Sequence, residues 1–150
     1  MPLGIESQAE MFRKIFVFNR TMEGKRIKIL IVYNSTSSAL VDGISAAFQS
    51  RGIETLAVRE DAVERTVKEQ KGKIQALYIT PGLSSSFDKL CSEHQVLSIT
   101  GVPTLTRLGK ASIALGVKSG KPSIIVHLQQ LKGEGQEFSA SFLQIAQIVQ

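Results

Sequence analysis

Apolar residues follow two spacings over the first two thirds of the chain. Nearly continuous apolar runs, bounded by glycine, proline or small polar residues, are typical of strands buried on both faces of a parallel sheet. Such runs cover residues 27–33, 53–58, 74–80 and 96–99. Apolar residues at helical spacing predict helices over residues 6–20, 38–51, 61–71 and 84–94. This alternation predicts a mostly parallel sheet with helices on both faces and right-handed crossovers.

The last third of the chain has a different pattern. Two short apolar runs, 112–118 and 123–128, flank a Ser-Gly-Lys-Pro segment that is typical of a hairpin loop. After a break at 133–135, Ser139 is expected to cap a final helix. Its expected core-facing residues are Phe142, Leu143, Ile145, Ala146 and Val149. We therefore predict one α/β domain over residues 1–150, a three-layer α/β/α sandwich with an antiparallel C-terminal edge pair.

Composition narrows the class of protein. The 150 residues are 43% hydrophobic, which is enough for a packed core. The net charge is +5, but the lysines and arginines are scattered and there is no Trp. Nucleic-acid binders usually cluster their charge on one face, so no nucleic-acid partner is expected.

The sequence also bears on redox chemistry and on location. Cys91 is the single cysteine, so no internal disulfide can form, and we expect its side chain to be buried. The N-terminal residues lack the charged and apolar regions of a signal peptide. No run approaches the roughly 18 apolar residues of a membrane span. The protein is thus either cytosolic or an exported protein whose signal has been removed.

Candidate ligand-binding residues follow the predicted strands. The carboxyl ends of parallel strands share one edge of a sheet, where ligands bind, and helix N-termini there favour anions or polar oxygens. The candidates are Asn34, Ser35, Thr36, Ser37, Thr80, Pro81, Gly82, Ser84, Thr100 and Gly101. The same residue types also make turns and caps, and Ser37 or Ser38 suits the cap of the following helix. Both interpretations remain open at this level.

Sharper motifs are absent from the sequence. It has no glycine-rich dinucleotide fingerprint, Walker loop or nucleophile elbow, and no His, Cys and acidic residues at metal-ligand spacing. We expect no catalytic residues, metal or cofactor. His127 suits a structural role, and the mixed charges of residues 60–65 suit a solvated helix face. Arg59 and Arg107 would meet an anionic ligand if they point toward the strand-end edge.

Several segments resemble the YfiR-type family. These are residues 96–100, 109–115, 123–128 and 135–146, which follow the family's strand, turn, strand and final-helix motifs. The leading helix at 9–18 and the strand at 76–79 match in layout, so the resemblance covers roughly residues 9–149.

The resemblance implies a non-enzymatic periplasmic regulator. Such proteins bind the periplasmic region of a membrane-anchored diguanylate cyclase, hold it inactive, and so restrain cyclic di-GMP output and biofilm formation. They are typically homodimers exported through a signal peptide. This chain departs from the family at three places. Thr100-Gly101 stands near the family's aspartate, His127 stands for its asparagine, and Cys91 leaves no cysteine pair for redox sensing.

Two further functions compete with regulation. The strand-end loops look like those of periplasmic solute-binding lobes, which recognise small polar ligands, although such proteins close two lobes of this size over a solute. An enzyme of the doubly wound class would need a base beside a nucleophile, and the sequence places none there.

Overall fold

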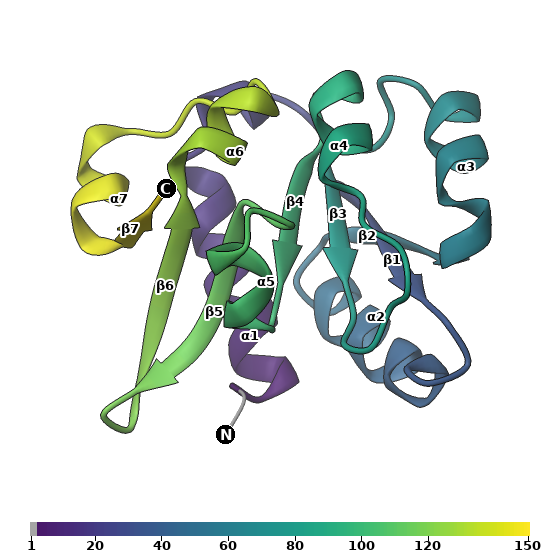
Figure 1. The fold of residues 1–150 in the computed structure, drawn as a ribbon, viewed down its shortest axis with the longest axis horizontal. Coiled ribbons are helices and arrows are strands. Elements are labelled where there is room, and N and C mark those ends of the chain that lie inside the picture. The colour runs from purple at the N-terminus through teal and green to yellow at the C-terminus, as the bar shows by residue number, and fades with distance from the viewer. Residues whose placement is uncertain (1–2) are drawn as a thin grey trace.

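A computed structural model describes residues 3–150, which form a seven-stranded sheet in the order β2-β1-β3-β4-β5-β6-β7 (Figure 1). The strands are β1 Lys28–Tyr33, β2 Glu54–Arg59, β3 Ala76–Ile79, β4 Leu97–Thr100, β5 Ile113–Lys118, β6 Lys121–His127 and β7 Gln147–Val149. Strands β1 to β5 are mutually parallel, β6 is antiparallel to β5, and β7 is parallel to β6. The carboxyl ends of β1 to β5 therefore share one edge, and the strand order reverses between β1 and β3.

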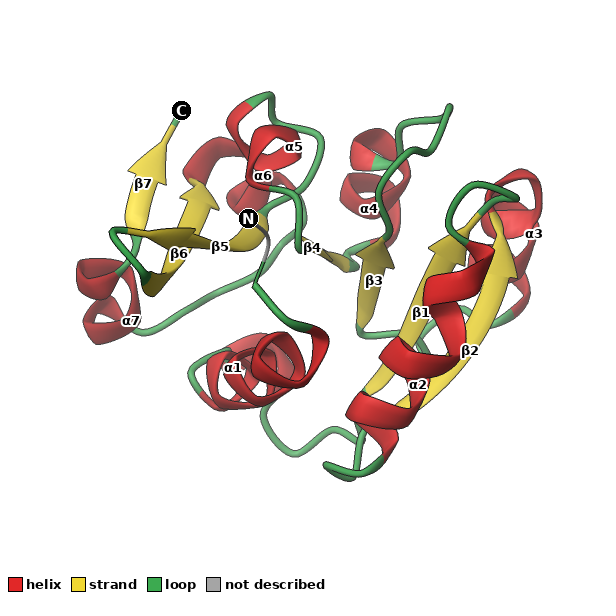
Figure 2. Cartoon of the chain, turned by 90° about the horizontal axis from the view of Figure 1, so that it is seen from below, coloured by secondary structure: helices red, strands yellow, loops and turns green. Residues whose placement is uncertain are grey.

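Helices cover both faces of the sheet (Figure 2). One face carries α1, α2 and α7, and the other carries α3, α4 and α5, while α6 lies beside α4. The helices are α1 Ile5–Val17, α2 Val41–Gln49, α3 Val63–Glu69, α4 Asp88–His94, α5 Pro103–Arg107, α6 Leu128–Gly133 and α7 Ala140–Ile145. Short 3-10 turns occupy Arg20–Met22, Ser38–Leu40 and Glu60–Ala62. The predicted three-layer α/β/α sandwich is confirmed.

Alternate strand residues fill two separate cores. On one face, Tyr78 forms T-shaped ring pairs with Phe12 and Phe48, at centroid distances of 6.3 and 6.0 Å. On the other face, Leu30 and the buried Cys91 belong to a second cluster. Because both faces of β1, β3 and β4 are covered, these strands read in the sequence as continuous buried runs.

The end of the chain departs from the predicted helix. That helix, α7, ends at Ile145, and Gln147–Val149 form β7 against the outer edge of β6, with Gln147 opposite Ile125. Ile145 is 67% exposed rather than core-facing, and Val149 lies in the strand. Unpaired backbone groups at the edge of β6 explain the change, because they offer a strand partner that helical spacing cannot reveal. The antiparallel pair is thus followed by a seventh strand.

One helix boundary and two short helices also differ from the prediction. Helix α4 starts at Asp88 instead of residue 84, and residues 84–87 form a loop. Helix α5 was not predicted, although Pro103 at its first position is a favoured helix start. Helix α6 was also missed, and His127, the last residue of β6, caps it by accepting a hydrogen bond from the Gln130 N–H to Nδ1 at 3.1 Å.

No helix within residues 3–150 combines the length and apolar character required to cross a bilayer.

Candidate functional site

The loop after β1 is closed by Asn34. Its Oδ1 accepts hydrogen bonds from the backbone N–H groups of Thr36 and Ser37, at 2.9 and 3.3 Å. Its Nδ2 donates to the carbonyl of Gly82, at 3.0 Å, and to Oε1 of Glu60, at 3.1 Å. A side-chain turn of this kind holds the backbone in place, and here it also ties the loop after β1 to the loop after β3.

Ser37 and Thr80 point into the protein. The Thr80 hydroxyl lies 2.7 Å from both the Val32 carbonyl oxygen and the Ser37 hydroxyl, and both side chains are buried. Ser37 therefore does not cap α2, which begins after a 3-10 turn with no side-chain cap at Leu40. The two hydroxyls form hydrogen bonds inside the protein, so they are not accessible to a ligand at the surface.

Glu60, which follows β2, joins a third loop to those after β1 and β3. Its Oε2 accepts hydrogen bonds from the backbone N–H groups of Ser84 and Ser85, at 2.9 and 3.2 Å, while Oε1 accepts from Asn34. Burial acts to raise the pKa of this carboxyl, but the donated hydrogen bonds outweigh it and the net pKa is lowered. The expectation of a solvated face at residues 60–65 is wrong for Glu60, because its carboxylate organises the loop cluster.

The predicted residues at the end of β4, Thr100 and Gly101, also make contacts within the protein. The Thr100 hydroxyl donates to the Ile79 carbonyl at 2.8 Å and accepts from the Val102 N–H at 3.2 Å. A Cβ at Gly101 would lie 2.6 Å from the carboxamide of Gln8, so glycine allows α1 to approach closely. That Gln8 accepts a hydrogen bond from the Tyr78 hydroxyl at 2.5 Å.

The remaining candidates lie at the surface of the strand-end edge. Gly82 has φ +83, which favours glycine at this turn. The exposed candidates are Ser35, Thr36, Pro81, Gly82 and Ser84. The structure thus brings the loops after β1, β2 and β3 together, as predicted. Of the two arginines singled out, Arg59 lies over the Tyr33 ring with its Cζ 5.8 Å from the centroid, and Arg107 lies in a cavity.

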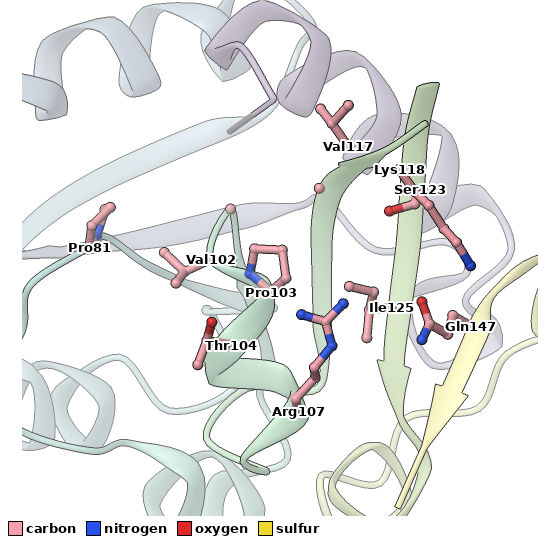
Figure 3. Close-up of a pocket in the computed structure, with 12 residues that line it drawn as sticks. Pro81, Val102, Pro103, Thr104, Arg107, Val117, Lys118, Ser123, Ile125 and Gln147 are labelled. Atoms are coloured by element: carbon pink, nitrogen blue, oxygen red, sulfur yellow. The ribbon is translucent and has the colours of Figure 1, made fainter. Parts of the chain in front are cut away.

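That cavity has a volume of about 550 Å³ and lies between α5 and the strands β5 to β7 (Figure 3). Only Pro81 and Gly101 of the predicted candidates line it. The other lining residues are Val102, Pro103, Thr104, Arg107, Gly116, Val117, Lys118, Ser123, Ile125 and Gln147. The site extends from the strand-end edge onto the outer part of the sheet, where sequence reasoning placed no pocket.

Glycine at the cavity wall sets its shape. Helix α5 rests on β5 and β6, and a Cβ at Gly116 would lie 2.7 Å from Cγ of Pro103. Gly116 thus allows the start of α5 to sit directly on β5. The sequence signals for this contact were Pro103, which follows β4, and Gly116, in the middle of β5. Only the tertiary structure shows that these two residues touch.

A separate buried carboxyl belongs to Glu134. It is fully buried, and Oε1 accepts from the Ser98 N–H at 2.9 Å and from the Ser112 hydroxyl at 2.5 Å. Oε2 accepts from the Ser98 hydroxyl at 2.5 Å and from Nε2 of Gln130 at 2.8 Å. Burial raises the pKa of Glu134 to about 7, against the opposing effect of these hydrogen bonds. Sequence reasoning missed this group, which interrupts the apolar face of β4 and β5.

Metal-ligand chemistry has no candidate centre, since no three His, Cys, Asp or Glu side chains of residues 3–150 gather as a cluster.

Comparisons with known proteins bear on the fold. No family model matches the chain. No curated protein matches it either. Solved structures do match. A ligand-free, open substrate binding protein with adhesive properties from Clostridium difficile, CD0873, has a TM-score of 0.72 at 15% identity. The match covers 99% of this chain and 60% of that one.

Two further structures have the same architecture. The ABC domain from Streptococcus pneumoniae in complex with L-Trp has a TM-score of 0.68, and a conserved domain protein from Vibrio cholerae has 0.69. Each is 11% identical, with 97% of this chain and 60% of the other covered. The chain therefore spans about 60% of the length of these structures and shares their α/β fold.

Proposed function

We propose that this domain is a non-enzymatic binding module that takes up a small polar solute at the carboxyl-end edge of its sheet. The observation that carries the proposal is the cavity of about 550 Å³ between α5 and β5 to β7. Its size is within the range of small-molecule sites, roughly 300–1,000 Å³, and it combines apolar walls with a few polar groups. The fold it shares with a structure described as a substrate binding protein supports the same function.

Binding, rather than catalysis, suits the state of the strand-end hydroxyls. Ser37, Thr80 and Thr100 are buried and bonded to neighbouring strands and loops. A nucleophile would need a free hydroxyl with a base in reach. The polar groups that face the cavity are instead the cations of Arg107 and Lys118, the hydroxyls of Thr104 and Ser123, and the carboxamide of Gln147.

A thermal-shift and calorimetric screen of amino acids, sugars and small organic acids tests the proposal. A true ligand at about 100 times its Kd stabilises the folded state by roughly 2.7 kcal/mol, which raises Tm by several degrees. The variant Ser123→Trp fills the cavity and should abolish the shift, whereas Ser84→Trp, on the loop cluster outside the cavity, should retain it. The absence of any shift, or its loss in Ser84→Trp alone, would count against this site.

Regulation of a membrane-anchored partner is a second candidate function. Exposed apolar side chains favour it, because Val117 and Ile148 share one face of the sheet and are 42% and 39% exposed. We propose, with the YfiR-type resemblance, that this face contacts a second copy of the chain or the periplasmic region of a diguanylate cyclase sensor.

A capture experiment on membranes from the encoding organism tests the regulatory proposal. Mass spectrometry should identify a membrane sensor or cyclase on the wild-type protein and not on the double variant Val117→Asp/Ile148→Asp. Light scattering of the purified protein should report a homodimer that the same variant dissociates. A monomer that captures no membrane sensor would contradict regulation while leaving solute binding untouched.

A further inference from the structure

The cavity carries positive charge that no acidic side chain within residues 3–150 offsets. Arg107 and Lys118 line it, and none of its described lining residues is acidic. Over residues 3–150, neither cation lies within 4.0 Å of a carboxylate, whereas six other basic side chains do. A cationic solute would therefore meet repulsion here, and an anionic one would meet attraction.

The polar groups converge from different elements. Figure 3 shows the Arg107 guanidinium, on the last turn of α5, reaching into the space between Pro103 and Ile125. On the opposite wall are Ser123 of β6 and Gln147 of β7. A guanidinium presents paired N–H donors in a plane, which match the two oxygens of a carboxylate, and a hydroxyl and a carboxamide can complete such a site.

One wall of the cavity is apolar. Val102, Pro103 and Ile125 form its wall beside the guanidinium. A bare inorganic anion would fill a small part of about 550 Å³ and would leave this wall in contact with water. A ligand that covers the wall must have an apolar body attached to its charged end.

We infer that the solute of this cavity is a small organic anion whose carboxylate is held by Arg107, with Lys118 nearby and its apolar body against Val102, Pro103 and Ile125. The inference rests on the proposed binding function and adds the chemical class of the ligand. It assigns Arg107 as the residue that determines specificity. The lysine supplies a second, longer-range charge that favours the anion over its neutral analogue.

Matched pairs of probes test the inference. Isothermal titration calorimetry at low and at 0.15 M salt would compare carboxylates with their primary amides: phenylacetate with phenylacetamide and hexanoate with hexanamide, with inorganic phosphate as the bare anion. Each carboxylate should bind at least about tenfold more tightly than its amide, as expected for a charge-assisted hydrogen bond. Arg107→Gln should remove most of that preference, leaving the smaller part due to Lys118, and should keep the wild-type Tm. Lys110→Gln, which removes one charge outside the cavity, should retain the preference.

The outcomes separate the two proposals. Amides that bind as tightly as carboxylates, or an anion preference that is undiminished in Arg107→Gln, would overturn the inference and leave solute binding in place. Phosphate that binds as tightly as the carboxylates would overturn the role of the apolar wall. A failure of every probe, together with a failure of the wider solute screen, would overturn both.

Discussion

Glu134 carries a pH dependence at the scale of a single residue. Its carboxyl is buried under Gln130 of α6 against Ser98 and Ser112, and its charge acts on the buried Cys91 thiol of α4. Loss of hydration raises its folded-state pKa from 4.5 to about 7. The folded protein therefore holds this proton to a higher pH than the unfolded chain does.

The contribution of protonated Glu134 to the free energy of unfolding is fully present below about pH 4.5, and it is lost as the pH rises through about 7. We expect the free energy of unfolding of the wild type, relative to that of Glu134→Gln, to fall by about 3 kcal/mol across this interval. Urea titrations of both proteins from pH 4.5 to 8 measure the difference, and other carboxyls cancel between them. Parallel stability profiles for the two proteins would contradict the buried titration.

Two glycines should respond to alanine in opposite ways. At Gly116 the new methyl would lie 2.7 Å from Pro103, so α5 must move off β5, at a cost of about 1–3 kcal/mol. At Gly43 in α2 nothing lies within 4 Å, and alanine should stabilise the protein by about 0.5–1 kcal/mol. Thermal unfolding compares the two variants with the wild type. A neutral Gly116→Ala variant would show that α5 is not seated on β5 as described.

At the scale of elements, Asn34 connects three loops. Asn34→Ala removes the turn after β1 and the links to Glu60 and Gly82. We expect a loss of about 1–2 kcal/mol in stability and faster amide exchange in residues 34–37 and 82–85. Ligand binding in the cavity should persist, because Asn34 does not line it. If Asn34→Ala instead lost solute binding while amide exchange stayed unchanged, the loop after β1 would contact the ligand directly.

The elements also show where sequence patterns reach their limit. The strands β1 and β3 and the helix α1 were predictable, because the sides on which they are buried set the spacing of apolar residues along the chain. The β7 strand was not, because Gln147–Val149 pair with an edge that is set by the distant β6. Helices α5 and α6, with five and six residues, are too short to leave a periodic signal.

For the whole molecule, the parallel sheet and its strand-end edge followed from the alternation of elements, whereas the candidate cavity did not. Sequence reasoning gathered the polar loops on one edge, but it could not show that Glu60 and Asn34 use the polar groups of those loops in hydrogen bonds within the protein. The cavity depends on α5 meeting the β5–β6 hairpin, a contact between segments that local patterns do not connect. Arg107 was recognisable from the sequence as a candidate to bind an anion. Only the tertiary structure shows Ser123 and Gln147 on the opposite wall of the cavity.

Cys91 is the one cysteine of this chain and its side chain is buried, so the rate at which its thiol is alkylated reports how often the fold opens. Burial, and next the charges of Glu134 and Asp88, raise its pKa well above the ordinary value, so the native protein presents neither access nor a thiolate to an alkylating reagent. Modification must wait until α4 separates from β4, and each 1.4 kcal/mol added to the cost of that separation slows labelling about tenfold. A bound solute that stabilises the sheet would thus slow the alkylation of Cys91, and this can be measured without an engineered probe.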